Sequence, residues 1–355
     1  MNQKQNILFL SFELSGYFMA CVKALVQKHN VTAHIVRYPI NPTAPFQFEE
    51  YENVQYYERN DFNQSQLSAL TKKIKPEVII CAGWSDKLYL NICKEFNSKT
   101  PTVLTFDNPW TGSLKQKVYS KFAPLYFKKI FSHVWVPGAN HKIFAQKLGF
   151  SNDSIHTGLY SADFELFYKE YQINKENKQK QFPHRILYVG RYTELKGVRE
   201  MWKAFVEWKS ETNNDWELWC LGKGDLDSEF PKHDQITNHG FVQPNDLPQF
   251  IAQCGVFILP SQIEHWGVVV HEYAAAGFPL ISNTNTSAAN FFLKDGYNGF
   301  VHKAKNKDSI KKVFNQLQQT SDQELIEMGE RSVEKAKEIT PNTWSDTVMK
   351  IMKNK

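Results

Sequence analysis

The sequence has few cysteines, and their spacing suits neither a metal site nor a disulfide framework. It contains five, an odd number, and none forms a Cys-X-X-Cys pair. Zinc fingers and disulfide-stapled secreted domains depend on closely spaced cysteine pairs, so these two classes are excluded. Several of the cysteines lie in apolar runs, which predicts buried free thiols in a reducing compartment: Cys21, Cys81, Cys93, Cys220 and Cys254.

Long apolar runs are also absent. No segment approaches the roughly 18 uncharged apolar residues of a membrane-spanning helix. The first apolar run, residues 7–12, is short and is followed at once by Glu13, whereas a secretory signal needs a longer apolar region and a small-residue cleavage site. We therefore expect a cytoplasmic protein.

The excess of positive charge is small. Lys and Arg number 42 against 37 Asp and Glu, which gives a net charge of +5. A nucleic-acid-binding protein typically needs a clustered basic face, and the sequence has no aromatic-basic sheet motif, so no nucleic-acid partner is expected. The 11 histidines form no HxxxH or similar metal-binding spacing. A bound metal is therefore not expected either.

The sequence does contain a regular alternation of short apolar segments and longer helix-like segments. This is the pattern of βα units around a parallel sheet. It runs through the first half of the chain and restarts in the second, which predicts an α/β protein with two Rossmann-like, doubly wound domains. The predicted strands are residues 7–12, 31–36, 78–81, 103–106 and 134–136 in the first domain and 186–189, 218–221, 256–259 and 280–282 in the second.

A polar stretch rich in lysine and glutamine separates the two halves. Residues 169–185, KEYQINKENKQKQFPHR, are predicted to be a linker and domain edge. The segment from about Ser321 onward has a helical pattern with a break at Pro341. We expect an N-terminal acceptor-binding domain over residues 1–165, a C-terminal donor-binding domain over 166–340 and a helix over 341–355 that packs toward the first domain.

The most informative segment is residues 260–280, PSQIEHWGVVVHEYAAAGFPL. A polar loop holds Glu264, and a helix then begins near Gly267 and carries Glu272. The N-terminus of a helix offers backbone N–H groups and a positive dipole end to a diphosphate, and Glu272 can accept hydrogen bonds from vicinal ribose hydroxyls. The alternative is that Glu264 only complements the helix dipole and that Glu272 is a solvated surface residue.

A second informative segment begins the same half of the chain. The strand ILYVG leads into residues 190–197, GRYTELKG, and then into a helix. Two cations on a strand-to-helix loop, Arg191 and Lys196, suit a pyrophosphate whose charge grows as a sugar leaves it. The alternative is that both are ordinary exposed cations.

In this order the two segments resemble the retaining glycosyltransferases of family 4, within the group 1 glycosyl transferases. The Gly-Arg-x4-Lys-Gly motif of that family corresponds to residues 190–197, and its Glu-x7-Glu signature corresponds to Glu264 and Glu272. The resemblance implies the GT-B fold, in which two Rossmann-like domains face a central cleft and a C-terminal helix crosses back to the first domain. Further matches are Pro260-Ser261, Trp266-Gly267 and the ending Gly277-Phe278-Pro279.

The resemblance also implies roles for individual residues. Arg191 and Lys196 bind the donor diphosphate and stabilise the leaving group, and Glu264 orients the transferred sugar. These three are the expected catalytic residues. The acceptor-side candidates are Asp107 and Asn108. The expected donor-binding residues are Gly16, Arg191, Lys196, Phe241, Val242, Glu264, His265, Trp266, Gly267, Val268 and Glu272.

The implied reaction moves a sugar, with retention of its anomeric configuration, from a nucleotide diphosphate sugar to a saccharide or lipid-linked saccharide in cell-surface polysaccharide synthesis. UDP-sugars are the commoner donors among relatives, and GDP-sugars come next. No Ser/His/Asp arrangement is visible by spacing, and the leaving diphosphate itself can take the acceptor proton. No cofactor and no divalent ion are expected.

Three places depart from the family pattern. The loop after the first strand has a single glycine, Gly16, Asp107 stands where many relatives have a histidine, and residues 283–289, NTNTSAA, lack the usual acidic pattern. These departures leave the transferred sugar unassigned. Residues 221–224, LGKG, imitate a dinucleotide fingerprint, but Asp227 stands where a glycine or alanine is required, so no NAD site is expected.

One long stretch carries positive charge only. From Asn108 to Asn152 there are seven lysines and no Asp or Glu. Within it, the segment from Leu114 to Phe131 mixes lysine with Tyr, Phe and Leu as interfacial helices do, and Pro124 breaks or kinks it. This predicts a surface that docks on anionic lipid at the inner face of the membrane. A helix packed on its own sheet with solvated lysines explains the pattern equally well.

Two rival functions remain open from the sequence. A nucleotide-sugar epimerase shares the two-domain architecture and would convert a donor without any acceptor. A non-catalytic sugar-binding protein of the same fold would keep its function after loss of Glu264 and Arg191.

Overall fold

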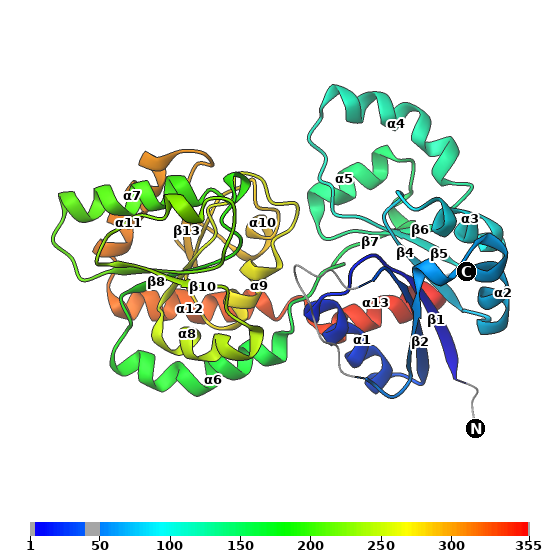
Figure 1. Cartoon of the computed structure of the whole chain (residues 1–355), viewed down its shortest axis with the longest axis horizontal. Helices are drawn as coiled ribbons and strands as arrows, with labels where there is room; N and C mark the ends of the chain where they lie inside the picture. The colour runs from blue at the N-terminus through cyan, green and yellow to red at the C-terminus, as the bar shows by residue number, and fades with distance from the viewer. Residues whose placement is uncertain (1–3, 40–49, 354–355) are drawn as a thin grey trace. The chain divides into compact units, whose positions relative to one another are not determined.

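The structure is a computed structural model that describes residues 4–39 and 50–353. The chain divides into two compact units (Figure 1). Unit 1 consists of Met1–Asp163 together with Ile339–Lys355, and unit 2 is Phe164–Glu338. Each unit contains a parallel β-sheet covered by helices, which confirms the predicted α/β fold class.

Unit 1 is built on a sheet with the strand order β3-β2-β1-β4-β5-β6-β7. Its strands pair in parallel, and the chain crosses from β3 back to β4 beside β1, as in a doubly wound sheet. Most of these strands are short apolar runs because both faces of the sheet are covered. The strands are β1 (Gln5–Leu10), β2 (Val31–Arg37), β3 (Val54–Glu58), β4 (Val78–Ala82), β5 (Thr102–Thr105), β6 (His133–Trp135) and β7 (Ile155–His156).

Two hydrophobic cores lie on the two faces of this sheet. Helices α1 and α13 pack on one face, and α2, α3 and α5 pack on the other, with α4 beyond α5 (Figure 1). The helices are α1 (Gly16–Lys28), α2 (Gln64–Ile74), α3 (Lys87–Phe96), α4 (Leu114–Phe127), α5 (Ala139–Lys147) and α13 (Pro341–Lys353).

The C-terminal helix α13 belongs to unit 1. The Trp344 indole N–H donates to the carbonyl of Leu159 at 2.9 Å, and its ring lies 4.9 Å from that of Trp135. An ion pair of 2.8 Å joins Lys28 on α1 to Asp346 on α13. The predicted return of the C-terminal helix to the first domain is therefore confirmed.

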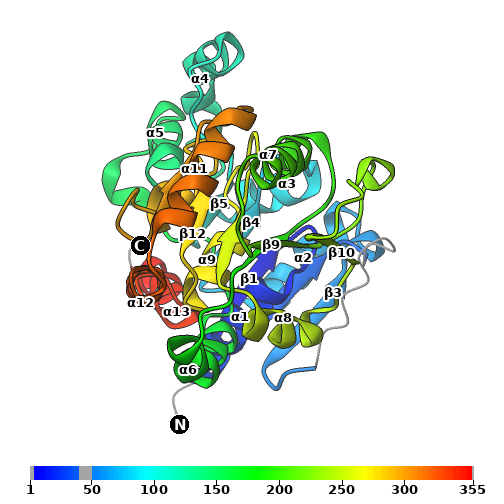
Figure 2. The ribbon, with the colours of Figure 1, turned by 90° about the vertical axis from the view of Figure 1, so that its left-hand side faces the viewer.

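Unit 2 repeats the architecture with the strand order β10-β9-β8-β11-β12-β13. Helices α7 and α11 pack together, while α6, α9 and α12 form a second packed group (Figure 2). The strands are β8 (Arg185–Val189), β9 (Glu217–Leu221), β10 (Ile236–Gly240), β11 (Val256–Ile258), β12 (Leu280–Ser282) and β13 (Gly299–Val301). The helices are α6 (Phe164–Lys180), α7 (Val198–Glu211), α8 (Leu247–Gln253), α9 (Val268–Ala275), α10 (Ala289–Phe292), α11 (Lys307–Gln319) and α12 (Asp322–Ala336).

The structure also contains short 3-10 turns and five cysteines. Short 3-10 turns occupy Arg59–Asp61, Asn152–Ser154, Glu194–Lys196, Asp227–Glu229 and Pro244–Asp246. All five cysteines are buried and free, which confirms the expectation of unpaired thiols.

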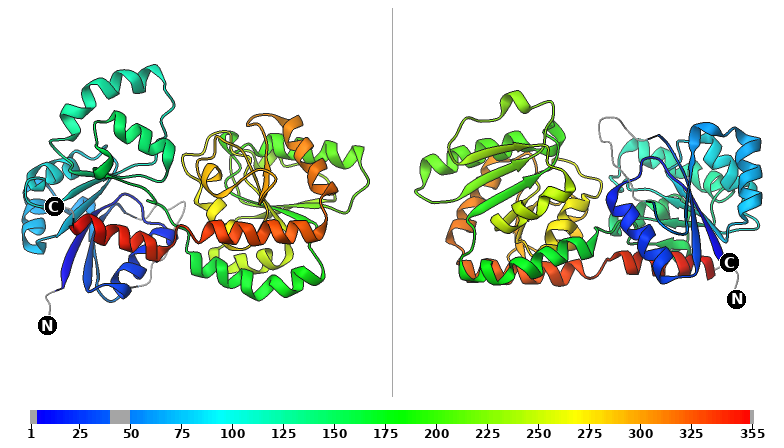
Figure 3. Two further views of the ribbon diagram at one scale, coloured as in Figure 1. Left: turned by 180° about the vertical axis from the view of Figure 1, so that it is seen from behind. Right: turned by 60° about the horizontal axis from the view of Figure 1, so that its bottom comes forward.

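The prediction of a linker over residues 169–185 is wrong, because most of this stretch forms helix α6. The helix begins earlier, at Phe164, and runs beside α12 and α9 (Figure 3). Phe167 contacts Tyr273 of α9 at a ring separation of 6.0 Å, and Phe164 and Tyr168 stack at 5.2 Å. A narrow row of aromatic side chains therefore packs this helix against α9. The other faces of the helix are polar, and because most of its residues are polar the segment resembled a linker.

A lysine near the end of α6 gives unit 2 a pH-dependent stability. The Lys178 ammonium lies 4.0 Å from the centroid of the Phe278 ring, and burial lowers the pKa of Lys178 to about 7. An unfolded chain binds this proton up to a pH of about 10.4. Between these two values the unfolded state holds a proton that the folded state lacks, so the free energy of unfolding rises with pH across this window. Below pH 7 the folded state carries this charge on a partly buried side chain.

Lys178→Met is therefore expected to raise the free energy of unfolding by about 1–3 kcal/mol at pH 6 and by less at pH 9.5. Urea denaturation at the two pH values measures the difference. Lys175→Met is the matched control: Lys175 lies on the same helix and pairs with Glu330 at 2.8 Å, so its loss should cost about 0.2–1 kcal/mol. An equal gain for Lys178→Met at both pH values would contradict the role of its ionisation.

Candidate functional site

Four loops of unit 2 meet at one edge of its sheet. They follow β8, β9, β11 and β12, which are parallel strands, so their carboxyl ends lie at the same edge. Most of the predicted donor-binding residues lie in these loops or on α9, the helix that follows β11. The structure therefore collects residues from distant parts of the sequence in one place.

Lys196 and Glu264 form the centre of this arrangement. The Lys196 ammonium donates to Oε2 of Glu264, and the Ser261 hydroxyl donates to the same oxygen at 3.3 Å. Both side chains are only partly accessible, with 21% of Lys196 and 18% of Glu264 exposed. Two residues that the sequence analysis selected from separate motifs are thus in direct contact.

A glycine with a left-handed backbone brings the two loops together. Gly197 has φ +67°, and a Cβ atom there would lie 2.3 Å from the carbonyl oxygen of Pro260. The backbone N–H of Gln262 also donates to the carbonyl of Leu195 at 2.8 Å. Only glycine permits this close approach. The last residue of the Gly-Arg-x4-Lys-Gly motif therefore serves to join the lysine loop to the glutamate loop.

The loop after β8 also rests on the loop after β9. The backbone N–H of Gly190 donates to the carbonyl of Leu221 at 3.0 Å, and that of Tyr192 donates to the carbonyl of Lys223 at 3.0 Å. Between them lies Arg191, whose side chain is exposed and whose carbonyl accepts a hydrogen bond of 2.9 Å from the Tyr188 hydroxyl. Arg191 is held on both sides by backbone contacts and presents its side chain to solvent.

The segment NTNTSAA after β12 supports the glutamate loop. The Glu264 N–H donates to the carbonyl of Asn285 at 3.1 Å, and the Ser287 N–H donates back to the carbonyl of Glu264 at 3.2 Å. The Asn283 side-chain amide donates to the carbonyl of Ser261, and that of Asn285 to the carbonyl of Gln262, both at 2.9 Å. In the sequence, this segment stands out only as a departure from the family pattern. Its two asparagines hold the glutamate loop in place, and no sequence motif marks them for that role.

Helix α9 begins where the sequence predicted. Gly267 is its N-cap with φ +93°, and because glycine has no side chain the first-turn amides are not covered by a cap. Glu272 is a part-buried residue of this helix and Val268 is its first residue. The Val270 N–H donates to the carbonyl of Gly267 at 3.0 Å, and the earlier amides of the first turn, with the positive end of the dipole, suit an anionic group.

The aromatic neighbours of Glu264 differ in exposure. Trp266 is buried, with 3% of its surface exposed, and its ring lies 6.2 Å from that of Phe292. His265 is exposed beside it. Trp266 therefore holds the loop against α10, and His265 is the member of the pair whose side chain faces solvent. Beyond β10, Phe241 is 63% exposed and Val242 is partly exposed.

The remaining predicted residues lie in unit 1. Gly16 is the first residue of α1, directly after the N-cap Ser15. Asp107 and Asn108 follow β5, and the Tyr160 hydroxyl lies 3.5 Å from Oδ2 of Asp107. Burial and the Asp107 carboxylate raise the pKa of Tyr160 well above its usual range. Tyr160 is therefore a neutral hydrogen-bond donor that fixes Asp107 at this edge.

A charged network that the sequence analysis missed also lies in unit 1. The Asp86 side chain is 2% exposed and accepts hydrogen bonds of 2.7 Å from both Arg59 and the Tyr38 hydroxyl. Burial alone would raise the pKa of Asp86, but these hydrogen bonds hold it below its usual value. Asp86 also caps α3 by accepting from the Leu88 N–H at 2.7 Å. An Asp before a helix is a typical N-cap, so this signal was present in the sequence.

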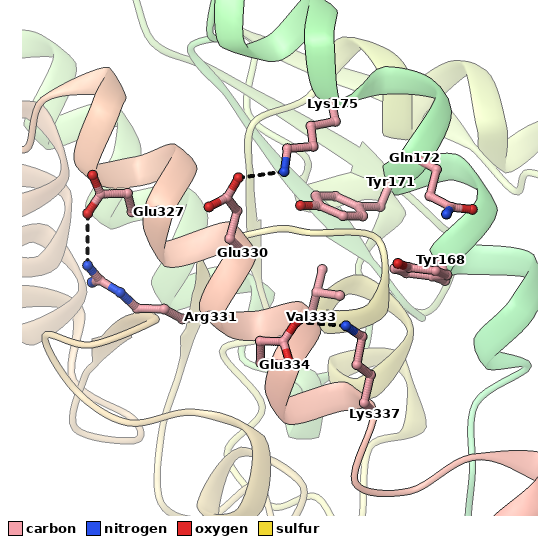
Figure 4. A pocket seen from close by; sticks show the side chains of 10 residues that line it. All are labelled: Tyr168, Tyr171, Gln172, Lys175, Glu327, Glu330, Arg331, Val333, Glu334 and Lys337. Atoms are coloured by element: carbon pink, nitrogen blue, oxygen red, sulfur yellow. Dashed lines mark hydrogen bonds and ion pairs between the residues drawn. The ribbon is translucent and has the colours of Figure 1, made fainter.

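A groove elsewhere in unit 2 has a different character. It has a volume of about 630 Å³ and lies between α6 and α12, with Tyr168 and Tyr171 on its wall (Figure 4). None of the loop residues described above lines it. Its charges are matched inside the groove, so it offers no surplus charge to a diphosphate. The pairs are Lys175–Glu330 at 2.8 Å, Arg331–Glu327 at 2.9 Å and Lys337–Glu334 at 2.7 Å.

The described residues contain neither a metal-binding cluster nor a membrane-spanning helix. Within residues 4–39 and 50–353, no three His, Cys, Asp or Glu side chains are grouped so that they could hold a metal ion. Across the same residues, every helix is too short or too polar to cross a bilayer.

The second unit resembles known proteins in sequence. Residues 169–338 match the family model of glycosyl transferases group 1. The chain is 28% identical over 123 residues to an alpha-D-kanosaminyltransferase of Streptomyces kanamyceticus, which covers 33% of this chain and 31% of that protein. It is 28% identical over 132 residues to an uncharacterized glycosyltransferase of Methanocaldococcus jannaschii, covering 35% and 33%. The chain thus spans about a third of the length of these relatives.

Solved structures share the fold of the whole chain. Sucrose-phosphate synthase from Thermosynechococcus elongatus has a TM-score of 0.73 at 16% identity, covering 99% of both chains. HepE of Anabaena, solved in complex with UDP, has a TM-score of 0.73 at 13% identity, covering 99% of this chain and 100% of that one. These similarities confirm the predicted GT-B fold of two Rossmann-like domains. Residues 169–338, just under half of the chain, therefore resemble the group 1 glycosyl transferases in sequence.

Proposed function

We propose that this protein is a retaining glycosyltransferase that moves a sugar from a nucleotide diphosphate sugar to a saccharide or lipid-linked saccharide. The observation that carries the proposal is the convergence of Lys196, Glu264 and the start of α9 at one sheet edge of unit 2. A cation, a carboxylate and a helix N-terminus are the groups that a diphosphate-linked sugar requires.

Each of these groups has a distinct part in the proposed reaction. Lys196 and Arg191 bind the diphosphate and stabilise the charge that develops on it as the sugar leaves. The first-turn amides of α9 bind the same anion. Glu264, which the NTNTSAA segment holds in place, orients the sugar, and Glu272 accepts hydrogen bonds from the ribose hydroxyls. His265, Phe241 and Val242 contact the rest of the donor.

Retention follows if the acceptor oxygen bonds to the anomeric carbon on the same face of the sugar from which the diphosphate leaves, while the departing diphosphate takes the proton of the acceptor hydroxyl. Bond cleavage then generates the base, and the cations that bind the diphosphate also favour the transition state over the ground state. Gly16, Asp107 and Asn108 serve the phosphate and acceptor side in this scheme. The reaction as proposed needs no cofactor and no metal ion, and activity in excess EDTA checks this point.

Uridine is the favoured donor base, and guanosine is the next candidate. HepE of Anabaena has been solved with UDP, with UDP and glucose, and with UDP-glucose. A neighbour described as an outer core galactosyltransferase of lipopolysaccharide has a TM-score of 0.70 at 14% identity. These relatives support a UDP-sugar donor and a role in the synthesis of cell-surface polysaccharide.

A thermal-shift experiment with UDP, GDP and their sugars tests the donor site. At a ligand concentration of 100 Kd, binding adds about 2.7 kcal/mol, which corresponds to a rise in Tm of about 5–10 °C for a domain of this size. The rise should be lost in Glu272→Ala and kept in Glu176→Ala, a matched control at an exposed glutamate of α6. No shift with any nucleotide would overturn the proposal.

The same preparation separates the transferase from its rivals. Incubation with a UDP-sugar in the absence of acceptor should leave the sugar unchanged, whereas an epimerase would convert it. A sugar-binding protein would show the thermal shift but no transfer to any acceptor.

A further inference from the structure

The outer face of α4 in unit 1 is unusually apolar for a protein surface. Helix α4 lies at the periphery of the unit, beyond α5 (Figures 1 and 2). Large apolar side chains that are mostly exposed are normally scattered singly over a surface. Here six of them lie on one helix of four turns. Their exposed fractions are 80% for Leu114, 58% for Val118, 39% for Tyr119, 71% for Phe122, 75% for Leu125 and 51% for Tyr126.

The spacing of these residues places them on one side of the helix. Leu114, Val118, Phe122 and Leu125 follow each other at intervals of four, four and three residues, which is the repeat of a single helix face. Five of the six line an open hollow of about 660 Å³ along α4, and Leu125 lies outside that lining. We call the six residues the α4 outer face.

The opposite side of α4 holds the helix to unit 1. Ala123 and Phe127 are 4% and 0% exposed, and the Phe127 ring lies 5.7 Å from that of Trp84. Pro124 lies inside the helix, where Gly149 at the end of α5 leaves room for it. Of the α4 outer face, Tyr119 also meets this core, with its ring 6.4 Å from that of Trp84, whereas Leu114, Phe122 and Leu125 are 71–80% exposed. These three apolar residues remain available to a partner.

The charges beside the α4 outer face select the partner. Lys117, Lys121 and Lys128 recur at intervals of four and seven residues, so they form a stripe along one flank of the helix, and all three are exposed. Lys115 is also exposed and lines the hollow beside these apolar residues. No Asp or Glu occurs between Asn108 and Asn152 to neutralise these charges. Apolar side chains with long flanking lysines, whose heads can reach outward to phosphates, match the interface of an anionic bilayer.

We propose that the α4 outer face docks on the surface of an anionic lipid bilayer, with its apolar residues in the acyl boundary and its lysines on the lipid phosphates. Charge complementarity favours this partner over a second copy of the chain, since two lysine stripes would repel each other. Pro124 does not interrupt the surface, because α4 continues to Phe127. The helix is long enough to lie in the plane of the interface and too short to span the bilayer.

The docking surface lies close in sequence to the acceptor-side candidates. Helix α4 begins at Leu114, six residues after Asn108, and both follow β5. A lipid-linked acceptor would then reach the carboxyl edge of the unit 1 sheet from the membrane on which α4 rests. This last step rests on the proposed transferase function, whereas the docking itself does not.

Co-sedimentation of the full chain with vesicles, without nucleotide or acceptor, tests the docking independently of catalysis. We expect binding to phosphatidylglycerol-containing vesicles at low salt, and much weaker binding to pure phosphatidylcholine or at 0.5 M salt. Phe122→Ser with Leu125→Ser should weaken the vesicle partition coefficient at least about thirtyfold. Lys117→Gln with Lys121→Gln should weaken it about 10- to 30-fold.

Matched variants at other exposed positions serve as controls. Ile173→Ser alters a side chain that is 58% exposed on α6, and Lys73→Gln with Lys94→Gln removes two exposed charges from α2 and α3. These should bind vesicles as the unchanged protein does. All variants should keep their Tm, because the replaced side chains are exposed. Failure to bind anionic vesicles at low salt, equal loss in the controls, or a concentration-dependent dimer that the Phe122→Ser and Leu125→Ser changes abolish would overturn the proposal.

Discussion

Lys196→Met is expected to lower the kcat of sugar transfer about 10²- to 10³-fold, with a smaller change in the KM for the donor. The reason is the charge that grows on the leaving diphosphate: an ammonium held beside it is worth more in the transition state than in the ground state. Lys196 is positioned for this by Gly197, which presses the loop against Pro260. Initial rates with saturating and limiting donor separate the two parameters.

The control for this prediction is Lys203→Met. Lys203 is an exposed lysine on α7, seven residues further along the chain, and its loss removes the same charge from the unit without touching the four loops. Its kcat should stay within about twofold of that of the unchanged protein. If Lys196→Met raised KM alone, the lysine would contribute only uniform binding, and the role in leaving-group stabilisation would be wrong.

Much of the fold could be predicted from the sequence, because buried parallel strands are short continuous apolar runs. Each of the nine predicted strands is present, with bounds that differ by at most two residues. The four that were missed carry weaker signals. β3 reads VQYYE and β10 reads ITNHG, which are polar edge strands, while β7 and β13 span only two and three residues. Their assignment depends on pairing with a neighbour rather than on composition.

Helix α6 shows where composition misleads. Its sequence from Lys169 onward is rich in Lys, Gln and Asn, and only an aromatic stripe marks its buried side. That stripe is meaningful once α9 and α12 are known to lie beside it, because Phe167 then has Tyr273 as a partner. The surface against which α6 packs is formed by residues about a hundred positions away in the sequence. The local sequence of α6 could therefore not indicate this packing.

For the candidate site, residue identities were accessible from the sequence and their mutual contacts were not. The family motifs selected Lys196 and Glu264, but their direct contact spans 68 residues of sequence and depends on the left-handed backbone of Gly197. The supporting role of Asn283 and Asn285 was hidden for the same reason. Their amides donate to carbonyls of a loop that precedes them by about 20 residues. Every residue has a backbone carbonyl, so the sequence does not indicate which carbonyl accepts a side-chain hydrogen bond.

Glu264→Gln and Glu272→Gln are expected to have opposite signatures, which makes the pair the sharpest test of the site. Glu264 shares its carboxylate with Lys196 and Ser261, and the proposed reaction places it at the sugar rather than at the nucleotide. The neutral isostere should lower kcat about 10²-fold because it no longer holds the cation and orients the sugar less well. The Kd for UDP alone should change by less than about threefold.

Glu272→Gln should instead weaken the binding of UDP and of the UDP-sugar by the same factor, about 10- to 100-fold, since it weakens two charge-assisted hydrogen bonds to the ribose that are present in both ligands. Its kcat at saturating donor should change little, because the ribose contact is the same before and during transfer. Isothermal titration with UDP and steady-state rates supply both quantities. A loss of UDP affinity in Glu264→Gln equal to that in Glu272→Gln would mean that Glu264 contacts the nucleotide, and the division between a sugar-orienting and a ribose-binding glutamate would have to be abandoned.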